Sequence, residues 1–547
     1  MLRIIFWLAF LGTGLYYELA AAVISVLLFL CLIRHKKLAI RVNVSSVAIF
    51  AISLFYALSA TWAVDGGIAV WGAVKHLPAV LFALCLMQEK RENRLKLLKD
   101  IPWLGAVMVT ISFALQFVPL LGDYFIISGR LGGFFQYPNT FACFLLLGLI
   151  VLLAEELPTD NPYLRTVRSI ILSFGLLESE SRAVMIIAIP MLLILLLIRK
   201  SLKITLWTAA EILCAVGLSF GASMLMGVDS GEHLADLSLH TSTFLGRILY
   251  WKDAIPQILK HPFGSGYLGY YFTQGSFQTG VYSVRWVHND LLQILLDIGW
   301  IPAVLSVLAA VKAVFSRRIC TMQRMVLLAL LAHCLFDFDL QFAAMYFVII
   351  LCLDWECGKE YAVSLRKIPV VITAILFSVA SLWIGLTSAL TYSGNHAAAA
   401  QIYPANTLSN INLLTQITEA DALEKAAAHI LKQNESVALA WNAKALAAYS
   451  RGDFGTMIQC KQQALSLSRY TLDEYIDYFS RLQVGVMLYQ QAGDTASAAI
   501  CEKEILSIQK AIDRVLAQTD PLAWQIADKP QLTMPKEYEN YVRTLQP

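Results

Sequence analysis

One segment of the chain carries the side chains best suited to moving a proton. His288 stands directly before Asn289, a residue type that is preferred at helix N-caps, and an apolar helical stretch follows. We therefore expect His288 to lie at the mouth of a helix, whose positive end favours a neutral, proton-accepting imidazole and also attracts phosphate. Gln293 and Asp297 continue down the same helix face. The alternative interpretation is a histidine that only caps the helix.

A second group of residues could stabilise negative charge. Arg182 lies in a very short turn, 178–182, between two apolar segments, where we expect it to point into the protein. Arginine binds diphosphate through its forked guanidinium, and ionisable residues at membrane depth are functional candidates. For each cation considered singly, the alternative is snorkelling at the membrane interface. The other cations predicted on the same side are Arg130, Arg247, Lys252, Lys260 and Arg285.

The segment that follows the largest predicted loop also has helical spacing. Apolar residues recur through 244–254, which predicts a helix lying along the membrane surface, with Arg247 and Trp251 on one face. This pair could hold a phosphate and a sugar, or Trp251 could be a plain interfacial anchor. The glycines of 261–269 form a GxGxxG pattern, but no strand precedes them, so we interpret them as a tight turn.

Two acids, Asp337 and Asp339, close a later apolar segment shortly after His333. Buried acids need hydrogen bonds or a cationic partner, so the leading interpretation is a structural ion pair. Their spacing is weak support for a metal site. We expect no metal ion and no cofactor.

The elements that must position these residues are membrane helices. The 547-residue chain is 58% hydrophobic and 15% charged, a balance that excludes a soluble protein. We expect a retained N-terminal membrane segment and an all-α polytopic fold of about 13 spans. The predicted spans are 3–16, 18–34, 44–63, 71–88, 101–121, 138–154, 167–180, 183–198, 204–226, 290–315, 325–338, 340–355 and 369–391.

Lysine and arginine clusters predict the orientation. They occur in every second loop, at 35–41, 90–99, 165–168, 199–203, 317–324 and 359–367, so these loops are predicted to be cytoplasmic. The large loop 227–288 and the tail then lie outside the cytoplasm. We accordingly divide the chain into a transmembrane domain, 1–391, and an extracytoplasmic helical domain, 392–547.

The tail is polar and helical in period. Ala440, Tyr449 and the Gly452-Asp453 turn resemble a tetratricopeptide repeat, with a weaker echo at Gly493-Asp494. A generic helical bundle is the alternative. The tail shows no catalytic constellation. Cys460 and Cys501 could form a disulfide in an oxidising compartment.

These motifs together resemble the O-antigen ligase and O-antigen polymerase (Wzy-type) superfamily, which includes bacterial O-oligosaccharyltransferases. The resemblance covers roughly residues 40–355. Each motif is weak alone, but their order, spacing and shared sidedness are fairly specific. The motifs are Phe135–Ala142, Ser181–Ala183, Arg247 with Tyr250-Trp251, His261-Pro262 with Gly264 and Gly266, and His288-Asn289 with Leu292-Gln293, Asp297 and Gly299.

The resemblance implies a GT-C-like membrane enzyme of the bacterial inner membrane. Such enzymes transfer an undecaprenyl-diphosphate-linked glycan to an acceptor without a metal ion, and Arg247 and His288 match the family's essential arginine and histidine. Asp297 departs from the usual glutamate, and the segment before Arg182 is unusually acidic. The candidate substrate-binding residues are Arg182, Arg130, Trp251, Tyr250, Asn139, Asn289 and Gln293, and the candidate structural acids are Asp337, Asp339 and Asp297.

Several functions remain open at this point. The acceptor could be lipid A-core, another glycan repeat, or a serine or threonine of a protein; the first is favoured slightly. A transporter or flippase would be expected to show paired broken spans or inverted repeats, and none is evident. A non-catalytic scaffold would leave the external arginines and His288 unexplained. The expected partners are therefore the lipid-linked glycan, its acceptor and the bilayer, with no nucleic acid.

Overall fold

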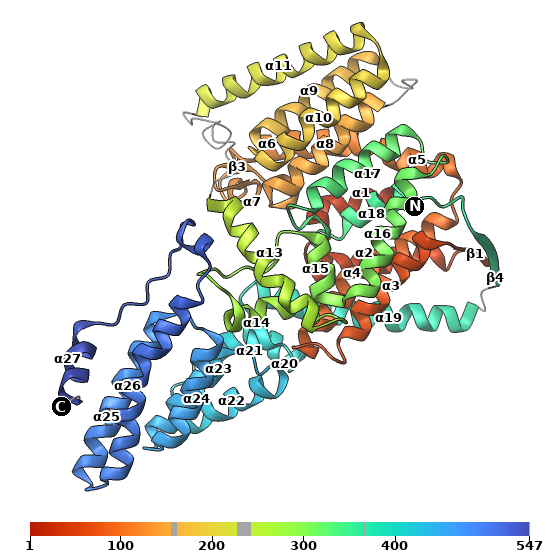
Figure 1. Ribbon diagram of the computed structural model, residues 1–547. Coiled ribbons are helices and arrows are strands. Elements are labelled where there is room, and N and C mark those ends of the chain that lie inside the picture. The colour runs from red at the N-terminus through yellow and green to blue at the C-terminus, as the bar shows by residue number, and fades with distance from the viewer. Residues whose placement is uncertain (155–160, 227–241, 365–366, 546–547) are drawn as a thin grey trace. The chain divides into compact units, whose positions relative to one another are not determined.

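The computed structural model describes residues 1–154, 161–226, 242–364 and 367–545. The described chain is built almost wholly from helices, which agrees with the predicted all-α class (Figure 1). It forms two compact units. The first unit contains 1–58, 70–238 and 288–389, and the second contains 59–69, 239–287 and 390–547. Residues 227–241 of the predicted external loop lie outside the described residues.

The first unit is a bundle of apolar helices, as expected where backbone polar groups must be satisfied within each segment. Its helices are α1 (Leu2–Leu11), α2 (Glu18–Leu32), α3 (Val44–Ser59), α4 (Gly66–Met87), α5 (Arg91–Lys99), α6 (Ile101–Leu115), α7 (Gly122–Phe125), α8 (Pro138–Ala154), α9 (Pro162–Glu178), α10 (Arg182–Arg199), α11 (Leu202–Met226), α15 (Asp290–Ile298), α16 (Trp300–Phe315), α17 (Thr321–Cys334), α18 (Ala344–Cys352) and α19 (Lys367–Tyr392). Short 3-10 turns lie at η1 (Thr13–Leu15), η2 (Gly133–Phe135) and η3 (Asp339–Gln341).

Among the described residues, five helical runs are long and apolar enough to cross a membrane, and six shorter apolar helices accompany them. The chain is therefore a multi-pass membrane protein, while the number of 13 spans stays a prediction. The long runs differ in their surroundings. The apolar window of α4 is 78% buried within the protein, whereas those of α10 and α11 are 17% buried. Apolar residues left this exposed are suited to contact lipid.

One predicted span is wrong as a continuous helix. The segment 290–315 is divided into α15 and α16, because Gly299 between them adopts φ 83° and ψ −169°, which interrupts the helix. This conformation is open to glycine but strained for other residues. A tight turn at Gly14 joins α1 to α2. Gly14 has φ 60°, and a Cβ there would lie 2.6 Å from the ring of Phe135.

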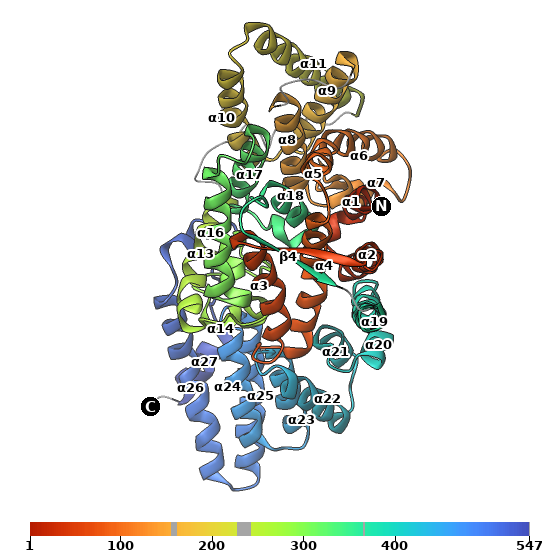
Figure 2. The same cartoon turned by 90° about the vertical axis from the view of Figure 1, so that its right-hand side faces the viewer.

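Three of the predicted cytoplasmic loops, 35–41, 90–99 and 359–367, meet at one end of the first unit. The strand β1 (Lys37–Val42) pairs antiparallel with β4 (Lys359–Ser364), although the two lie more than 300 residues apart in sequence (Figure 2). Arg41 forms ion pairs with Glu356 and Glu360, and Arg94 also pairs with Glu356. The clustering of these basic loops agrees with the alternation seen in the sequence. Their assignment to the cytoplasm stays a prediction.

The acids Asp337 and Asp339 lie at the opposite end of the same bundle. Helix α17 begins near Arg324 of the basic end and finishes at Cys334, just before these acids. Helix α18 then returns from Ala344 toward Glu356. The two-stranded hairpin of β2 (Ile126–Ile127) and β3 (Arg130–Leu131) precedes α8 in this unit.

The second unit is also helical. Its elements are α13 (Ser242–Lys260), α14 (Gly269–Phe277), α20 (His396–Ile402), α21 (Thr407–Leu414), α22 (Ala420–Gln433), α23 (Ala438–Ser450), α24 (Phe454–Leu467), α25 (Leu472–Gln491), α26 (Thr495–Ala517), η4 (Pro521–Trp524) and α27 (Lys536–Leu545). In the tail, α25 and α26 lie side by side along their length (Figure 1). The helix predicted over 244–254 is confirmed as part of α13, and Gly264 and Gly266 both have positive φ, as a tight turn requires.

Both Gly-Asp turns of the tail join a pair of helices. Gly452 and Gly493 have φ of 74° and 77°. Asp453 and Asp494 then cap the next helix by accepting hydrogen bonds from Thr456 N and Ser497 N. The repeat-like pairing of helices is present, and its membership of the tetratricopeptide class stays a prediction. Cys460 and Cys501 are free, buried thiols, so the possible disulfide is not formed.

Candidate functional site

His288 lies immediately before α15, as the sequence predicts. The Asn289 side chain caps this helix by accepting a hydrogen bond from Leu292 N at 3.0 Å. His288 itself has φ 52°, a left-handed backbone conformation. Its Nδ1 atom lies 3.2 Å from Oδ1 of Asp337, and its side chain is 22% exposed while that of Asp337 is 0% exposed. The imidazole is thus held by a buried carboxylate yet keeps one part of its ring accessible.

The Asp337 carboxylate is fixed by several donors. Its Oδ1 accepts a hydrogen bond from the Tyr137 hydroxyl at 2.8 Å and another from Phe338 N at 3.0 Å. Its Oδ2 accepts a hydrogen bond from Asn139 Nδ2 at 2.8 Å. A carboxylate held in this way orients the histidine bound to it, since the hydrogen bond at Nδ1 decides which tautomer the ring adopts. The hydroxyl and amide donors to Asp337 come from Tyr137 and Asn139, at the N-terminal end of α8.

Arg130 extends this network from the β2–β3 hairpin. Its Nη2 donates to Asn139 Oδ1 at 2.9 Å, and its Nε donates to the Ser179 carbonyl at 2.8 Å. Burial lowers the pKa of the Arg130 guanidinium, and the positive charge of Arg182 acts in the same direction. Arg182 is the first residue of α10 and lies two residues after Glu180, whose φ is 47°. The structure therefore brings Arg130, Arg182, Asn139, Asp337 and His288 to one end of the first unit.

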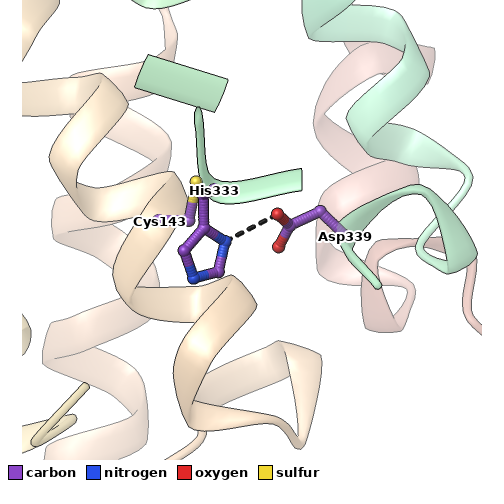
Figure 3. Close-up of side chains that lie close together, drawn as sticks. All are labelled: Cys143, His333 and Asp339. Atoms are coloured by element: carbon purple, nitrogen blue, oxygen red, sulfur yellow. Dashed lines mark hydrogen bonds and ion pairs between the residues drawn. The ribbon is translucent and has the colours of Figure 1, made fainter. Parts of the chain in front are cut away.

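A second buried network lies beside the first. Asp339 accepts hydrogen bonds from the Thr140 hydroxyl at 2.7 Å and from His333 Nδ1 at 2.6 Å, and Figure 3 shows the imidazole pointing at the carboxylate. Donor atoms of Cys143, His333 and Asp339 lie within 4.8 Å of one another, as do those of Asp290, Cys334 and Asp339. Such groupings could hold a metal ion. The 2.6 Å contact is nevertheless a hydrogen-bond distance, and the expectation of no metal stays a prediction.

Farther along α15, Gln293 and Asp297 lie together as predicted. Gln293 Nε2 donates to Asp297 Oδ1 at 2.8 Å, and the Tyr56 hydroxyl donates to Asp297 Oδ2 at 3.0 Å. Both side chains are buried. Asp290, at the start of the same helix, accepts from Leu340 N at 3.0 Å. These hydrogen bonds connect α15 to neighbouring segments. His288, directly before α15, is more exposed than these buried side chains.

The remaining predicted residues belong to the second unit, where α13 carries Arg247, Tyr250 and Trp251. Trp251 Nε1 donates to the Val287 carbonyl at 3.0 Å, and the ring of Tyr250 packs on Tyr282 with centroids 4.6 Å apart. Burial raises the pKa of the Tyr250 hydroxyl, while the nearby Arg247 charge opposes this shift. The approach of Arg247 to His288 stays a prediction.

Sequence reasoning missed some residues of both networks. Tyr137 and Thr140 stand within the segment that carried the resemblance, so their position beside Asn139 was an available signal. His333 was noted only as part of an acidic segment. In the second unit, outside both networks, Asp253 was also missed; it accepts hydrogen bonds from Thr279 N at 2.8 Å and from the Tyr282 hydroxyl at 2.8 Å. Nothing in a single sequence connects it to loop 278–284.

The first network can perform proton transfer beside positive charge. A histidine oriented by a buried carboxylate can take a proton from a hydroxyl, and two neighbouring arginines can stabilise a negatively charged leaving group. No curated protein and no solved structure matches the chain. A family model described as O-antigen ligase matches residues 168–307, a segment that includes Arg182, Arg247 and His288. This match confirms the resemblance to the O-antigen ligase and polymerase superfamily over residues 168–307.

Proposed function

We propose that the protein transfers a glycan from a lipid diphosphate to an acceptor hydroxyl on the outer side of the inner membrane. The observation that carries this proposal is the His288–Asp337 pair, which is anchored through Asn139 to Arg130. The O-antigen ligase match over residues 168–307 supports an enzyme that joins or polymerises such glycans.

In this mechanism His288 is the general base. Its neutral imidazole takes the proton from the acceptor hydroxyl as the oxygen attacks the anomeric carbon of the donor sugar. The bond between that carbon and the diphosphate oxygen breaks, and the lipid diphosphate leaves with the bonding electrons. Asp337 orients the imidazole and stabilises the imidazolium that forms.

The leaving diphosphate gains negative charge, which arginines can stabilise in a partly buried site. Arg182 and Arg130 are the candidates within the first unit, and Arg247 is the candidate on α13. Fixed guanidinium groups can supply this charge without a metal ion, and we include metal independence in the proposal. We place Tyr250 and Trp251 beside Arg247 as contacts for the glycan.

Alanine variants test the assignment. His288→Ala and Arg247→Ala should each abolish glycan transfer in cells while the protein still inserts into the membrane. Lys260→Ala on the same helix as Arg247, and His35→Ala at the basic end, are matched controls that should retain transfer. A normal product on a glycan-stained gel from either test variant would refute the proposed mechanism.

The acceptor needs a separate assay. We propose lipid A-core as the first acceptor, with another glycan repeat and a protein serine or threonine as alternatives. Purified full-length protein would be supplied with a labelled undecaprenyl-diphosphate glycan and each acceptor in turn. Label that moves to lipid A-core supports a ligase, and label that moves only to glycan or protein assigns the enzyme to one of the alternatives.

A further inference from the structure

The first unit contains a pocket of about 340 Å³ whose walls are mostly aromatic. This volume lies within the range of small-molecule sites. The pocket is formed by the α1–α2 hairpin, the segment before α8 and the segment around η3, which are distant in sequence. Its lining residues are Tyr16, Tyr17, Ile127, Phe135, Gln136, Tyr137, Phe338 and Phe342.

The pocket shares a wall with the proposed catalytic pair. The ring of Phe338 meets the His288 imidazole edge to face, with centroids 4.9 Å apart. The same Phe338 ring stacks on Tyr137 at 4.6 Å, and the Tyr137 hydroxyl donates to Asp337. A group bound in the pocket would therefore lie one side chain away from the proposed base.

Gln136 supplies the polar edge of the pocket. Its carboxamide oxygen accepts a hydrogen bond from the Tyr17 hydroxyl at 3.1 Å. Across the part of the chain that the structure describes, its amide nitrogen donates to no protein acceptor, so two N–H donors are available to a ligand. Gln136 also has φ 55°, a conformation that costs free energy in any residue with a side chain.

The chemistry of these walls selects one class of ligand. None of the eight lining residues is charged, which argues against a phosphate or diphosphate as the occupant. A prenyl chain has no polar group that could accept a hydrogen bond from the Gln136 amide. A pyranose ring matches both features, since its C–H faces can lie on aromatic rings while its hydroxyls accept hydrogen bonds from an amide.

We propose that this aromatic pocket is a sugar subsite that holds a pyranose ring beside His288. The inference rests on the proposed function and specifies the substrate class at that site. The ring could be the first sugar of the lipid-linked donor or the sugar of the acceptor, because both meet at the base during transfer.

A binding experiment with full-length protein in nanodiscs tests this subsite. Two variants are used: Gln136→Leu removes the amide, and Gln136→Gly removes the whole side chain at a backbone conformation that glycine adopts readily. Gln116→Leu, outside the pocket, is the matched control. The probes are undecaprenyl-diphosphate glycan, undecaprenyl diphosphate without sugar, and a soluble acceptor glycan.

We expect both Gln136 variants to bind a sugar-bearing probe about tenfold more weakly, which is the effect of losing one or two hydrogen bonds. Their affinity for the sugar-free lipid should be unchanged. Weaker binding of the donor glycan alone assigns the donor sugar to the pocket, and weaker binding of the acceptor alone assigns the acceptor sugar. The subsite would be refuted if the Gln136 variants lost as much affinity for the sugar-free lipid as for the sugar-bearing probes. It would also be refuted if their affinity for all three probes were unchanged.

The readout is affinity, so it separates this inference from the proposed function. If His288→Ala is inactive and the Gln136 variants bind every probe normally, only the sugar subsite fails. If His288→Ala retains transfer, the catalytic assignment fails whatever the affinities of the Gln136 variants.

Discussion

Replacing Asp337 with asparagine tests whether this acid acts through His288. The carboxylate accepts hydrogen bonds from Tyr137, Asn139 and Phe338 N, and it contacts the imidazole. Asparagine keeps one acceptor oxygen and places an NH₂ group toward donors. Hydrogen bonds to a charged group contribute about 1.5–3 kcal/mol each. If Asp337→Asn loses one or two such hydrogen bonds, the transition state should lose ~3–4 kcal/mol of stabilisation. This corresponds to a fall in kcat of about 10²–10³-fold.

Because Asp337 is fully buried, the KM for either substrate should change little. Kinetics with purified protein in nanodiscs and a labelled lipid-diphosphate glycan would measure both constants. Asp339→Asn is the matched control, since it removes a neighbouring buried carboxylate that binds Thr140 and His333. It should lower the melting temperature while reducing kcat per folded molecule far less. A kcat for Asp337→Asn within about threefold of the unmodified enzyme would contradict the positioning role.

Three further predictions concern other parts of the chain. Burial raises the pKa of the Asp253 carboxyl above its usual value, so ionising this group should destabilise the second unit. Compared with the Asp253→Asn variant, the melting temperature of the unmodified protein should be highest below about pH 4, and it should fall as the pH rises through the raised pKa. A chelator should leave glycan transfer intact, and metal analysis should find far less than one ion per chain; stoichiometric metal would instead assign an ion to the buried group of Cys143, His333 and Asp339. A reporter fused after residue 391 should score as extracytoplasmic, and a cytoplasmic score would overturn the predicted orientation.

Element positions could be predicted well where a long apolar run decides them. The predicted span 138–154 coincides with α8, and 369–391 differs from α19 by two residues at its start and one at its end. The break between α15 and α16 could not be predicted, because a single glycine within an apolar helix is usually tolerated. Gly299 shows its effect only through its backbone angles.

The site was predicted less completely because its partners are remote in sequence. His288, Asn139 and Arg130 were identified individually, and the structure joins them through Asp337. A buried acid is expected to take hydrogen bonds or a cationic partner, but its sequence position does not identify Tyr137 and Asn139 as those partners, and Asn139 lies 198 residues away. One sequence contains no information on which distant side chains become neighbours. The pairing of β1 with β4 was missed for the same reason.

Left-handed backbone conformation occurs at three residues near the proposed site. Among the described residues, nine non-glycine positions have positive φ, and Gln136, Glu180 and His288, with φ of 47–55°, are three of them. Each such residue costs about 1 kcal/mol or more, and such strain persists where the surrounding structure fixes it, frequently at functional sites. Glycine would adopt the same angles at lower cost. At two of these positions the side chain has a proposed role, which is the sugar contact for Gln136 and the proton transfer for His288.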